Sequence, residues 1–195
     1  MKNGLMNDIR NRIINDVLIP SIHMLYKVDY ANIYYGVSER NICARLAHHM
    51  ENIMREYHDK KMFQDYYADV EYNRIGKDGV LKYYEDSEHE PQYMVSDLLI
   101  HRRGISPNLL AVEIKKKGNH RNEDKDKERL KSLVYPSSNY SNTECVHDTL
   151  VGAFITYSEK YVRMELYESD EDCRVSTKTI HFIVSGAGSL TRINA

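Results

Sequence analysis

Two carboxylic acids and a lysine lie within the apolar middle of this 195-residue sequence. Asp97 interrupts the apolar run 94–100, and Glu113 lies in the apolar run 109–114, with Lys115 two residues further on. Carboxylates can hold a divalent metal ion, and such an ion can activate water and neutralise the charge that develops during phosphodiester hydrolysis. These residue types therefore suit metal-dependent phosphodiester hydrolysis, provided that the fold brings them together.

The two apolar runs and the turn-rich segment 102–108 between them predict a β-hairpin, with a loop slightly longer than the tightest turns. Because side chains alternate between the faces of a strand, Glu113 and Lys115 share one face and stand about 7 Å apart. The alternate apolar residues of the run 109–114 take the other face, which we expect to be the more deeply buried. An unpaired carboxylate inside an apolar run is costly, so Asp97 is expected to converge with the other two groups.

A helix that precedes the hairpin is expected to carry a third acid. Ser38 is a suitable N-cap for a helix that runs to about residue 57. The apolar positions of this helix form one stripe, made up of Ile42, Leu46, Met50, Ile53 and Tyr57. Glu39 falls on the same stripe. The helix dipole favours a glutamate in the first turn, but on the core-facing side this carboxylate also needs a partner.

The remaining patterns complete a predicted order of helix, three strands, helix and at least one strand. The predicted strands outside the hairpin are 66–74, 149–157, 161–167 and an edge strand at 178–185. A turn signal at 76–79 predicts that residues 80–84 return as a hairpin arm. A helix is predicted over 124–135, stopped by Pro136. Alternation alone predicts an α/β or α+β domain with a mixed sheet.

The N-terminal residues 5–26 have apolar positions at helical spacing, with a break or kink expected just before Pro20. We predict two parts of the chain, an N-terminal helical extension at 1–37 and a domain at 38–195. Packing of the first helix on the core is favoured over a role in dimerisation.

Asp97 with Glu113-x-Lys115 sixteen residues later resembles the signature of the PD-(D/E)XK nuclease superfamily, with Ser96 where the family name has proline. The segments that carry the resemblance are VEYNR at 70–74, DLLIHRRG at 97–104 and NLLAVEIKKK at 108–117. They look like small bacterial and phage members of the superfamily, and the resemblance covers about residues 38–167. It implies a restriction-endonuclease-like α-βββ-α-β core, with a mixed central sheet flanked by helices, and nuclease activity.

The resemblance also implies roles for individual residues. Asp97 and Glu113 would be the primary ligands of Mg²⁺, for which Mn²⁺ would substitute, and the carbonyl of Ile114 would be a further ligand. Lys115 would orient the attacking water, help its deprotonation or stabilise the charged phosphorane. Glu39 would act through a metal-bound water or a second ion.

Nucleic acid, with DNA favoured over RNA, is the expected partner. The net charge of −2 argues against indiscriminate binding of polyanions, but residues 115–131 contain eight Lys or Arg and four Asp or Glu. Superfamily members often keep a polar or basic residue on the helix 124–135, so Lys127 is a candidate by resemblance. Lys117 and Arg121 either contact phosphate or are merely solvated. A homodimer would suit cleavage of both strands of a duplex.

Glu71 is a secondary candidate, because it lies in the segment VEYNR. An exposed acid on a strand is the default interpretation of this position. Its inclusion rests on the resemblance alone.

The composition indicates an ordinary globular chain. No apolar run approaches the roughly 20 residues of a membrane-spanning helix. The segment 1–12 lacks the apolar region of a signal peptide. Three cysteines without paired spacing indicate free thiols in a reducing compartment. We therefore expect a cytoplasmic protein that does not bind membranes.

Two alternatives to a nuclease stay open. One is a catalytically inactive nuclease-fold module that binds nucleic acid or protein. The other is a structural protein in which Asp97, Glu113 and Lys115 form a buried ion network.

Overall fold

The computed structural model describes residues 2–59, 61–72, 74–75, 80–81, 83–85, 91–93, 95–103, 105–135, 149–170 and 174–193. Its centre is a seven-stranded sheet with the strand order β1-β6-β7-β8-β9-β10-β11. The strands are β1 (Tyr67–Val70), β6 (Leu98–Arg102), β7 (Ile105–Lys116), β8 (Thr149–Tyr157), β9 (Tyr161–Ser169), β10 (Val175–Ser185) and β11 (Ser189–Ile193). β7 and β8 are parallel, and the other neighbouring pairs are antiparallel. The predicted mixed sheet is confirmed.

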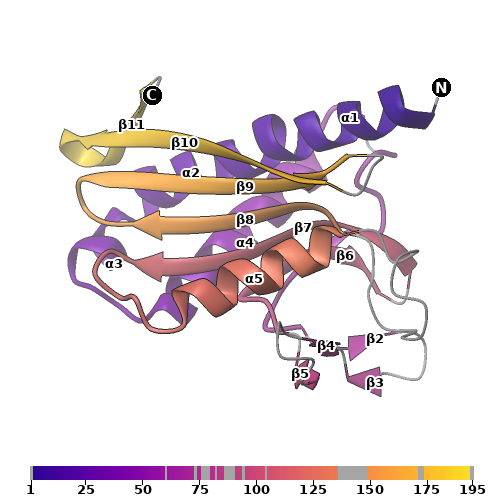
Figure 1. Cartoon of the computed structure of the whole chain (residues 1–195). Coiled ribbons are helices and arrows are strands. Elements are labelled where there is room, and N and C mark those ends of the chain that lie inside the picture. The colour runs from indigo at the N-terminus through magenta and orange to yellow at the C-terminus, as the bar shows by residue number, and fades with distance from the viewer. Residues whose placement is uncertain are drawn as a thin grey trace.

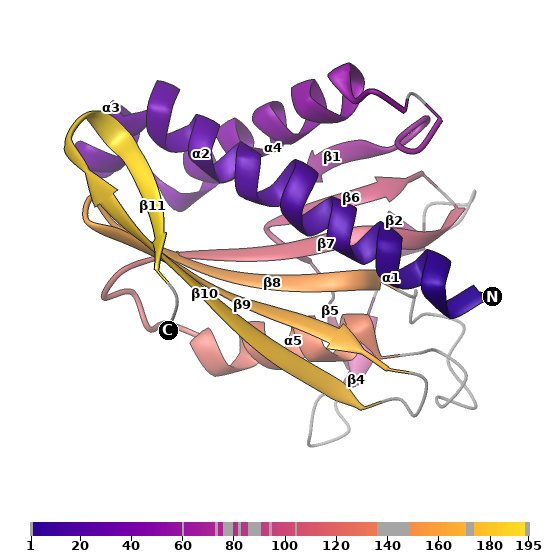
Figure 2. The same ribbon diagram turned by 90° about the horizontal axis from the view of Figure 1, so that it is seen from above.

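Helices cover both faces of this sheet (Figure 1). The helical segments are α1 (Lys2–Arg12), the π-helical η1 (Ile13–Leu18), α2 (Ile19–Val28), α3 (Tyr30–Tyr34), α4 (Glu39–Glu56) and α5 (Glu123–Val134). Seen from above, α1, α2 and α4 lie on one face, and α5 lies on the other (Figure 2). α5 connects the parallel strands β7 and β8. The elements α4, β1, β6, β7, α5 and β8 therefore follow the predicted order of helix, three strands, helix and strand.

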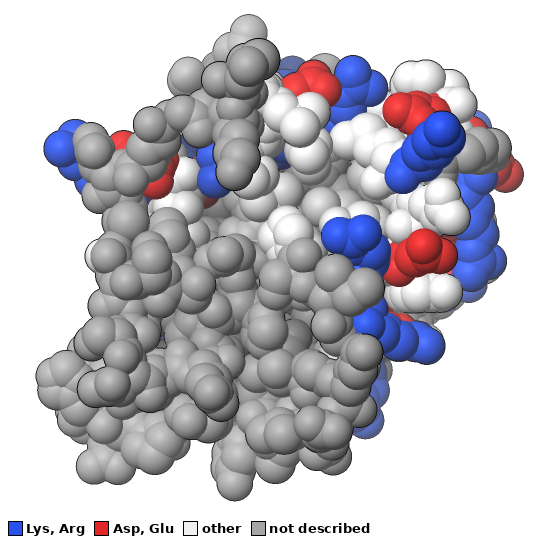
Figure 3. All heavy atoms as spheres, turned by 90° about the vertical axis from the view of Figure 1, so that its right-hand side faces the viewer, with Lys and Arg blue, Asp and Glu red and all other residues white. Residues whose placement is uncertain are grey.

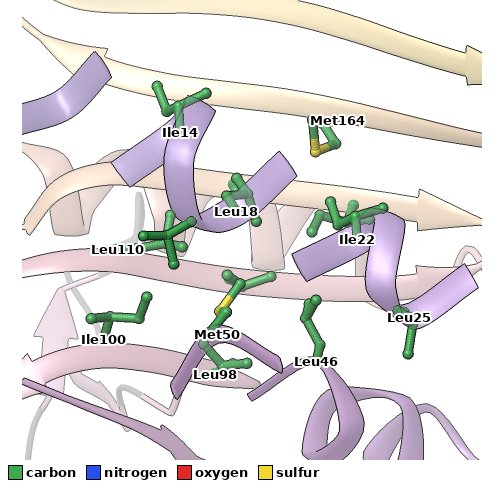
Figure 4. Close-up of a cluster of buried hydrophobic side chains, with 14 of the residues drawn as sticks. Ile14, Leu18, Ile22, Leu25, Leu46, Met50, Leu98, Ile100, Leu110 and Met164 are labelled. Carbon is green, nitrogen blue, oxygen red and sulfur yellow. The ribbon is translucent and has the colours of Figure 1, made fainter. Parts of the chain in front are cut away.

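The buried apolar side chains form two cores, one on each face of the sheet. In the larger core, helix residues such as Leu18 and Ile22 meet strand residues such as Ile100 and Leu110 (Figure 4). The smaller core, beneath α5, consists of Leu99, Ala111, Leu130, Leu133, Val134, Phe154 and Tyr167. Each large apolar side chain that is fully buried contributes about 1.5–3 kcal/mol. Along β7, Leu110, Val112 and Ile114 pack in the larger core, which places Glu113 and Lys115 on the α5 face.

The break or kink expected just before Pro20 takes the form of a local change in helix type, and the chain stays helical through it. A π-helical segment, η1, precedes α2, and Pro20 lies in the first turn of α2. Proline has no N–H to donate and its ring clashes with the carbonyl four residues earlier, so the wider π turn accommodates it without a break. Ile13, Val17 and Leu18 of this segment are fully buried in the larger core. The N-terminal helices therefore share a core with the sheet.

The prediction for α4 is confirmed. The Ser38 hydroxyl accepts a hydrogen bond from the Asn41 N–H at 3.3 Å, as an N-cap residue does. Ile42, Leu46 and Met50 are at most 1% exposed. This apolar stripe fixes the orientation of α4 about its axis, and with it the direction in which Glu39 points.

The strand predicted at 66–74 is shorter than expected. β1 ends at Val70, because Glu71 has a positive φ of 53° that is incompatible with an extended strand. The residues that follow form two separate two-stranded sheets. These are β2 (Arg74–Ile75) with β3 (Val80–Leu81), and β4 (Tyr83–Glu85) with β5 (Pro91–Tyr93). The hairpin arm is thus present as β3, while the predicted turn at 76–79 lies outside the described residues.

The central hairpin is tighter than predicted. Arg102 pairs with Ile105, which leaves a two-residue loop where the sequence predicted a loop at 102–108. β7 therefore includes Pro107, which cannot donate to a neighbouring strand, and the register of β6 shifts between Ile100 and Arg102.

Two further strand boundaries differ from the prediction. β6 begins at Leu98, so Asp97 precedes the strand instead of lying inside it. The edge of the sheet is β11, beyond the strand predicted at 178–185. Among the described residues, no helix is long and apolar enough to cross a membrane.

Candidate functional site

Glu113 and Lys115 lie near the end of β7, on the face that α5 covers. Glu113 is 1% exposed. Lys115 is half-buried, and its ammonium lies 2.9 Å from Asp126 on α5. The expectation that these two side chains share one face of the strand is therefore confirmed.

Asp97 joins them from the residue just before the neighbouring strand β6. Its Oδ2 accepts a hydrogen bond from the Ile114 N–H at 2.8 Å. The last residue of β6 paired with β7 at this end is Leu98, opposite Val112. The carboxylate thus continues the hydrogen-bond ladder beyond the end of β6, which explains why Asp97 lies outside the strand and still contacts β7.

Glu39 reaches the same edge of β7 from the first turn of α4. Its Oε1 accepts hydrogen bonds from the Lys116 N–H and from Asn119 Nδ2, each at 2.8 Å. Ile114 and Lys116 are two residues apart, so their N–H groups point to the same edge of the strand. In an antiparallel ladder one residue presents its N–H and C=O to the same neighbour, so the Ile114 carbonyl points to this edge as well. Asp97, Glu39 and this carbonyl are brought together where β6 stops.

Two residues that the sequence did not identify as a pair close the cluster from α5. Arg129 contacts Glu113 Oε1 through Nε at 2.9 Å and through Nη2 at 2.7 Å. Arg129 Nη2 also lies 2.7 Å from Asp126 Oδ1. Asp126 precedes Leu130 by four residues and Arg129 by three, so helical spacing was a usable signal. It was missed because an acid among DKDKER is normally solvated.

When all groups are ionised, Asp97, Glu113 and Asp126 carry one negative charge more than Lys115 and Arg129 balance, and the carboxylate of Glu39 lies beside them. Burial raises the pKa of Asp97 above its ordinary value, although the Ile114 N–H and the charge of Lys115 oppose the increase. Burial also raises the pKa of Glu113 well above its ordinary value, against the opposing charge of Arg129. The carboxyl groups of Asp97 and Glu113 lie close enough to influence each other's pKa, and the charge of Asp97 adds to the increase at Glu113. Such a pair favours either a shared proton or a bound cation.

Lys115 keeps its proton in this environment. Burial alone would lower its pKa, but the hydrogen bond and charge of Asp126, followed by the charges of Asp97 and Glu39, raise it. Lys115 is therefore a cation and a proton donor in this structure.

The buried thiol of Cys43 is influenced by the charges of all four predicted acids. This thiol is 3% exposed and lies on α4, one turn after Glu39. Burial raises its pKa, and the charges of Asp97, Glu113, Glu39 and Glu71 add to the increase. All four predicted acids are thus within electrostatic reach of one buried atom.

Glu71 lies at the margin of the cluster. Its backbone N–H donates to the carbonyl oxygen of Asp97 at 3.2 Å, while its side chain forms an ion pair with Arg40. The structure therefore places Glu71 beside Asp97 but directs its carboxylate to an arginine.

The donor set suits a hard divalent cation. Within the described part of the chain, no three His, Cys, Asp or Glu side chains are arranged to hold a metal ion. Mg²⁺, however, commonly takes only one or two protein carboxylates and keeps several waters. Asp97 and Glu113 supply two adjoining carboxylates, and the net negative charge of the cluster favours a cation.

The three candidate nucleic-acid contacts are in different environments. Lys127 is paired with Glu123 at 2.8 Å and with Glu165 at 3.0 Å. Lys117 is exposed, with its ammonium 4.8 Å from the ring centre of Tyr161. Arg121 is also exposed, in the turn before α5. Lys117 and Arg121 are therefore accessible to a polyanion, whereas two carboxylates already neutralise Lys127.

The described side chains at the opposite end of β7 carry both signs of charge (Figure 3). Figure 3 faces that end, since β7 points away from this side in Figure 1. Basic and acidic side chains of the described residues lie next to one another there (Figure 3). The described part of this face therefore has mixed charge.

Comparisons of the chain with models of protein families, with curated proteins and with solved structures find no match.

Proposed function

We propose that this protein is a divalent-metal-dependent nuclease of the PD-(D/E)XK type, which hydrolyses phosphodiester bonds of nucleic acid, with DNA favoured over RNA. The observation that carries the proposal is the convergence of Asp97, Glu113 and Lys115, with Glu39 beside them, where β6 ends against β7. The succession α4, β1, β6, β7, α5 and β8 in a mixed sheet supports a restriction-endonuclease-like core.

Asp97, Glu113 and the Ile114 carbonyl would hold the cation. When bound, Mg²⁺ or Mn²⁺ supplies Lewis-acid polarisation of a phosphoryl oxygen and a more acidic water. The two carboxylates would hold the cation in a defined place, because the Ile114 N–H fixes Asp97 and Glu113 is buried.

Lys115 contributes a positive charge and a proton. Because its pKa is raised, it donates hydrogen bonds to the attacking water or to the phosphoryl oxygens and stabilises the charge of the phosphorane. Glu39, held by Lys116 N–H and Asn119, is placed to accept a hydrogen bond from a water at the site.

Nucleic acid would approach over the loop between β7 and α5, where Lys117 and Arg121 are exposed. We also propose a cytoplasmic location, a homodimer that cuts both strands of a duplex, and Glu71 as an auxiliary acid beside Asp97.

One observation favours the structural alternative. Glu113 and Lys115 are each already paired with a residue of α5, so the charges of the cluster are largely satisfied within the protein. A buried network of this kind can exist for stability or specificity alone. The nuclease proposal is supported by the number of acids, since Asp97, Glu113 and Asp126 outnumber Lys115 and Arg129 when all five groups are ionised.

Cleavage of a substrate panel tests the proposal. Plasmid, linear duplex, single-stranded DNA and RNA would be incubated with Mg²⁺ or Mn²⁺, beside EDTA and a Glu113→Gln variant. Cleavage that needs the metal and is lost in the variant is the expected result, and it also identifies the substrate. Binding of one nucleic acid without cleavage would indicate an inactive module instead.

A further inference from the structure

Arg129 contacts one of the two carboxylate oxygens of Glu113. Its Nε and Nη2 both contact Glu113 Oε1, at 2.9 and 2.7 Å. The side chain of Arg129 is 16% exposed and that of Glu113 is 1% exposed. The guanidinium therefore neutralises a carboxylate that water cannot reach.

A divalent cation and this guanidinium compete for Glu113. Both are positive, and a buried site of low polarisability strengthens the repulsion between them. We therefore expect a cation that binds Asp97 and Glu113 together to weaken the contact of Arg129 with Glu113.

Asp126 gives Arg129 a second partner. Arg129 Nη2 lies 2.7 Å from Asp126 Oδ1, so the side chain can leave Glu113 without losing its only counter-charge. Lys115 holds the other oxygen of Asp126 at 2.9 Å. Asp126 thus links Arg129, which contacts Glu113, to Lys115, which is proposed to act in hydrolysis.

We propose that Arg129 is a displaceable counter-ion of Glu113: it releases Glu113 when a divalent cation binds, stays tethered to Asp126, and then offers its guanidinium to the substrate phosphodiester. This inference rests on the proposed function. The planar fork of donors suits a phosphate, and exchange of one anionic partner for another costs less than exposing an unpaired arginine.

Manganese affinity of variants tests the exchange. Arg129→Gln should bind Mn²⁺ more tightly than the wild-type protein, by about tenfold or more, because the competing cation is gone. Lys131→Gln removes the same charge from an exposed position of α5 and should leave the affinity within about twofold. Arg129→Lys keeps the charge, so its Mn²⁺ affinity should lie between those of the other two variants. Affinity that is unchanged or weaker in Arg129→Gln would overturn the proposal.

A second measurement uses the wild-type protein and does not depend on a variant that folds poorly. The Nε–H resonance of Arg129, assigned by its absence in Arg129→Lys, should shift and exchange faster with water as Mg²⁺ is added. A resonance that stays fixed while the amide of Ile114 shifts would contradict the displacement.

The two proposals fail in different ways. One possible result is that the wild-type protein binds Mn²⁺ and cleaves nucleic acid, while Arg129→Gln binds Mn²⁺ no more tightly than the wild type. This result would overturn the role of Arg129 alone. Absence of Mn²⁺ binding in every variant overturns the counter-ion role together with the nuclease function.

Discussion

Asp97 and Glu113 are two acids that the fold holds together in a buried place. Asp97 precedes a strand and caps an N–H of its neighbour, whereas Glu113 lies inside a strand and meets an arginine. Burial raises the pKa of both, so the folded protein keeps protons on this pair at a pH where the unfolded chain has released them. The ionisation of the pair is therefore coupled to folding.

The sign of this coupling gives a prediction for Asp97→Asn. A raised carboxyl pKa stabilises the fold fully below the ordinary value near 4, and this stability is lost as pH rises through the raised pKa. As pH rises above about 4, the wild-type free energy of unfolding should fall relative to that of the variant. The slope can reach about 1.4 kcal/mol per pH unit over the range where the two states differ by one proton. Urea unfolding at a series of pH values measures it.

Asp124→Asn serves as the matched control, since this acid is exposed on α5. Its unfolding free energy should follow that of the wild type at every pH. Parallel curves for wild type and Asp97→Asn would show that the carboxyl of Asp97 is not perturbed by burial.

Lys115 should separate catalysis from metal binding. Lys115→Ala removes a protonated donor and should slow cleavage by about a hundredfold or more. Mn²⁺ should bind at least as tightly as in the wild type, because the variant removes a repelling charge. Lys115→Arg should recover part of the rate. Equal loss of cleavage and of Mn²⁺ affinity in Lys115→Ala would show instead that the lysine holds the site together.

At the level of elements, the end of β6 determines where the acids meet. β7 continues beyond β6, so its edge exposes the N–H groups of Ile114 and Lys116. Asp97 and Glu39 bind these two groups, as a further length of strand would. The free edge of β7 is thus the feature that gathers acids from α4 and from the start of β6.

α5 is the second element on which the site depends, and Gly152 allows it to lie close to β8. A Cβ at this position would lie 3.3 Å from the Leu130 carbonyl and 3.4 Å from Tyr167 Cβ. Gly152→Ala should therefore push α5 away from the sheet, loosen Asp126 and Arg129, and destabilise the fold by about 1–3 kcal/mol.

A glycine in open space provides the control for this substitution. A Cβ at Gly186 would meet nothing within 4 Å, so Gly186→Ala should leave the melting temperature close to that of the wild type. Equal melting temperatures for the two alanine variants would show that α5 does not depend on close contact at Gly152.

At the level of the whole molecule, periodicity predicts the elements and their order well. The apolar stripe of α4, the alternation along β7 and the strands β8 and β9 follow directly from the sequence. The two-residue hairpin loop was missed because Pro107 and Asn108 favour turns locally, and pairing across the sheet overrides that preference. The early end of β1 depends on a positive φ at Glu71, which glutamate rarely adopts.

In the site, too, the sequence predicts individual residues better than contacts between distant elements. Asp97, Glu113, Lys115 and Glu39 could be named from the sequence, because hydrophobic patterns place acids at unusual positions. The pairing of Glu113 with Arg129 could not, since it depends on how far α5 slides along the sheet and on the rotation of α5 about its axis. Distances between elements are set by packing, which a single sequence does not reveal.

The most direct test of a cation site at Asp97 and Glu113 is the change in melting temperature on adding Ca²⁺ to EDTA-treated protein. At a concentration about a hundredfold above the dissociation constant, binding stabilises the folded state by about 2.7 kcal/mol. For a chain of this size that corresponds to a rise of about 5–10 °C. The wild type should show this rise and Glu113→Gln should lose it. A wild-type melting temperature that does not respond to Ca²⁺, or an equal rise in Glu113→Gln, would show that the cluster is a self-contained ion network.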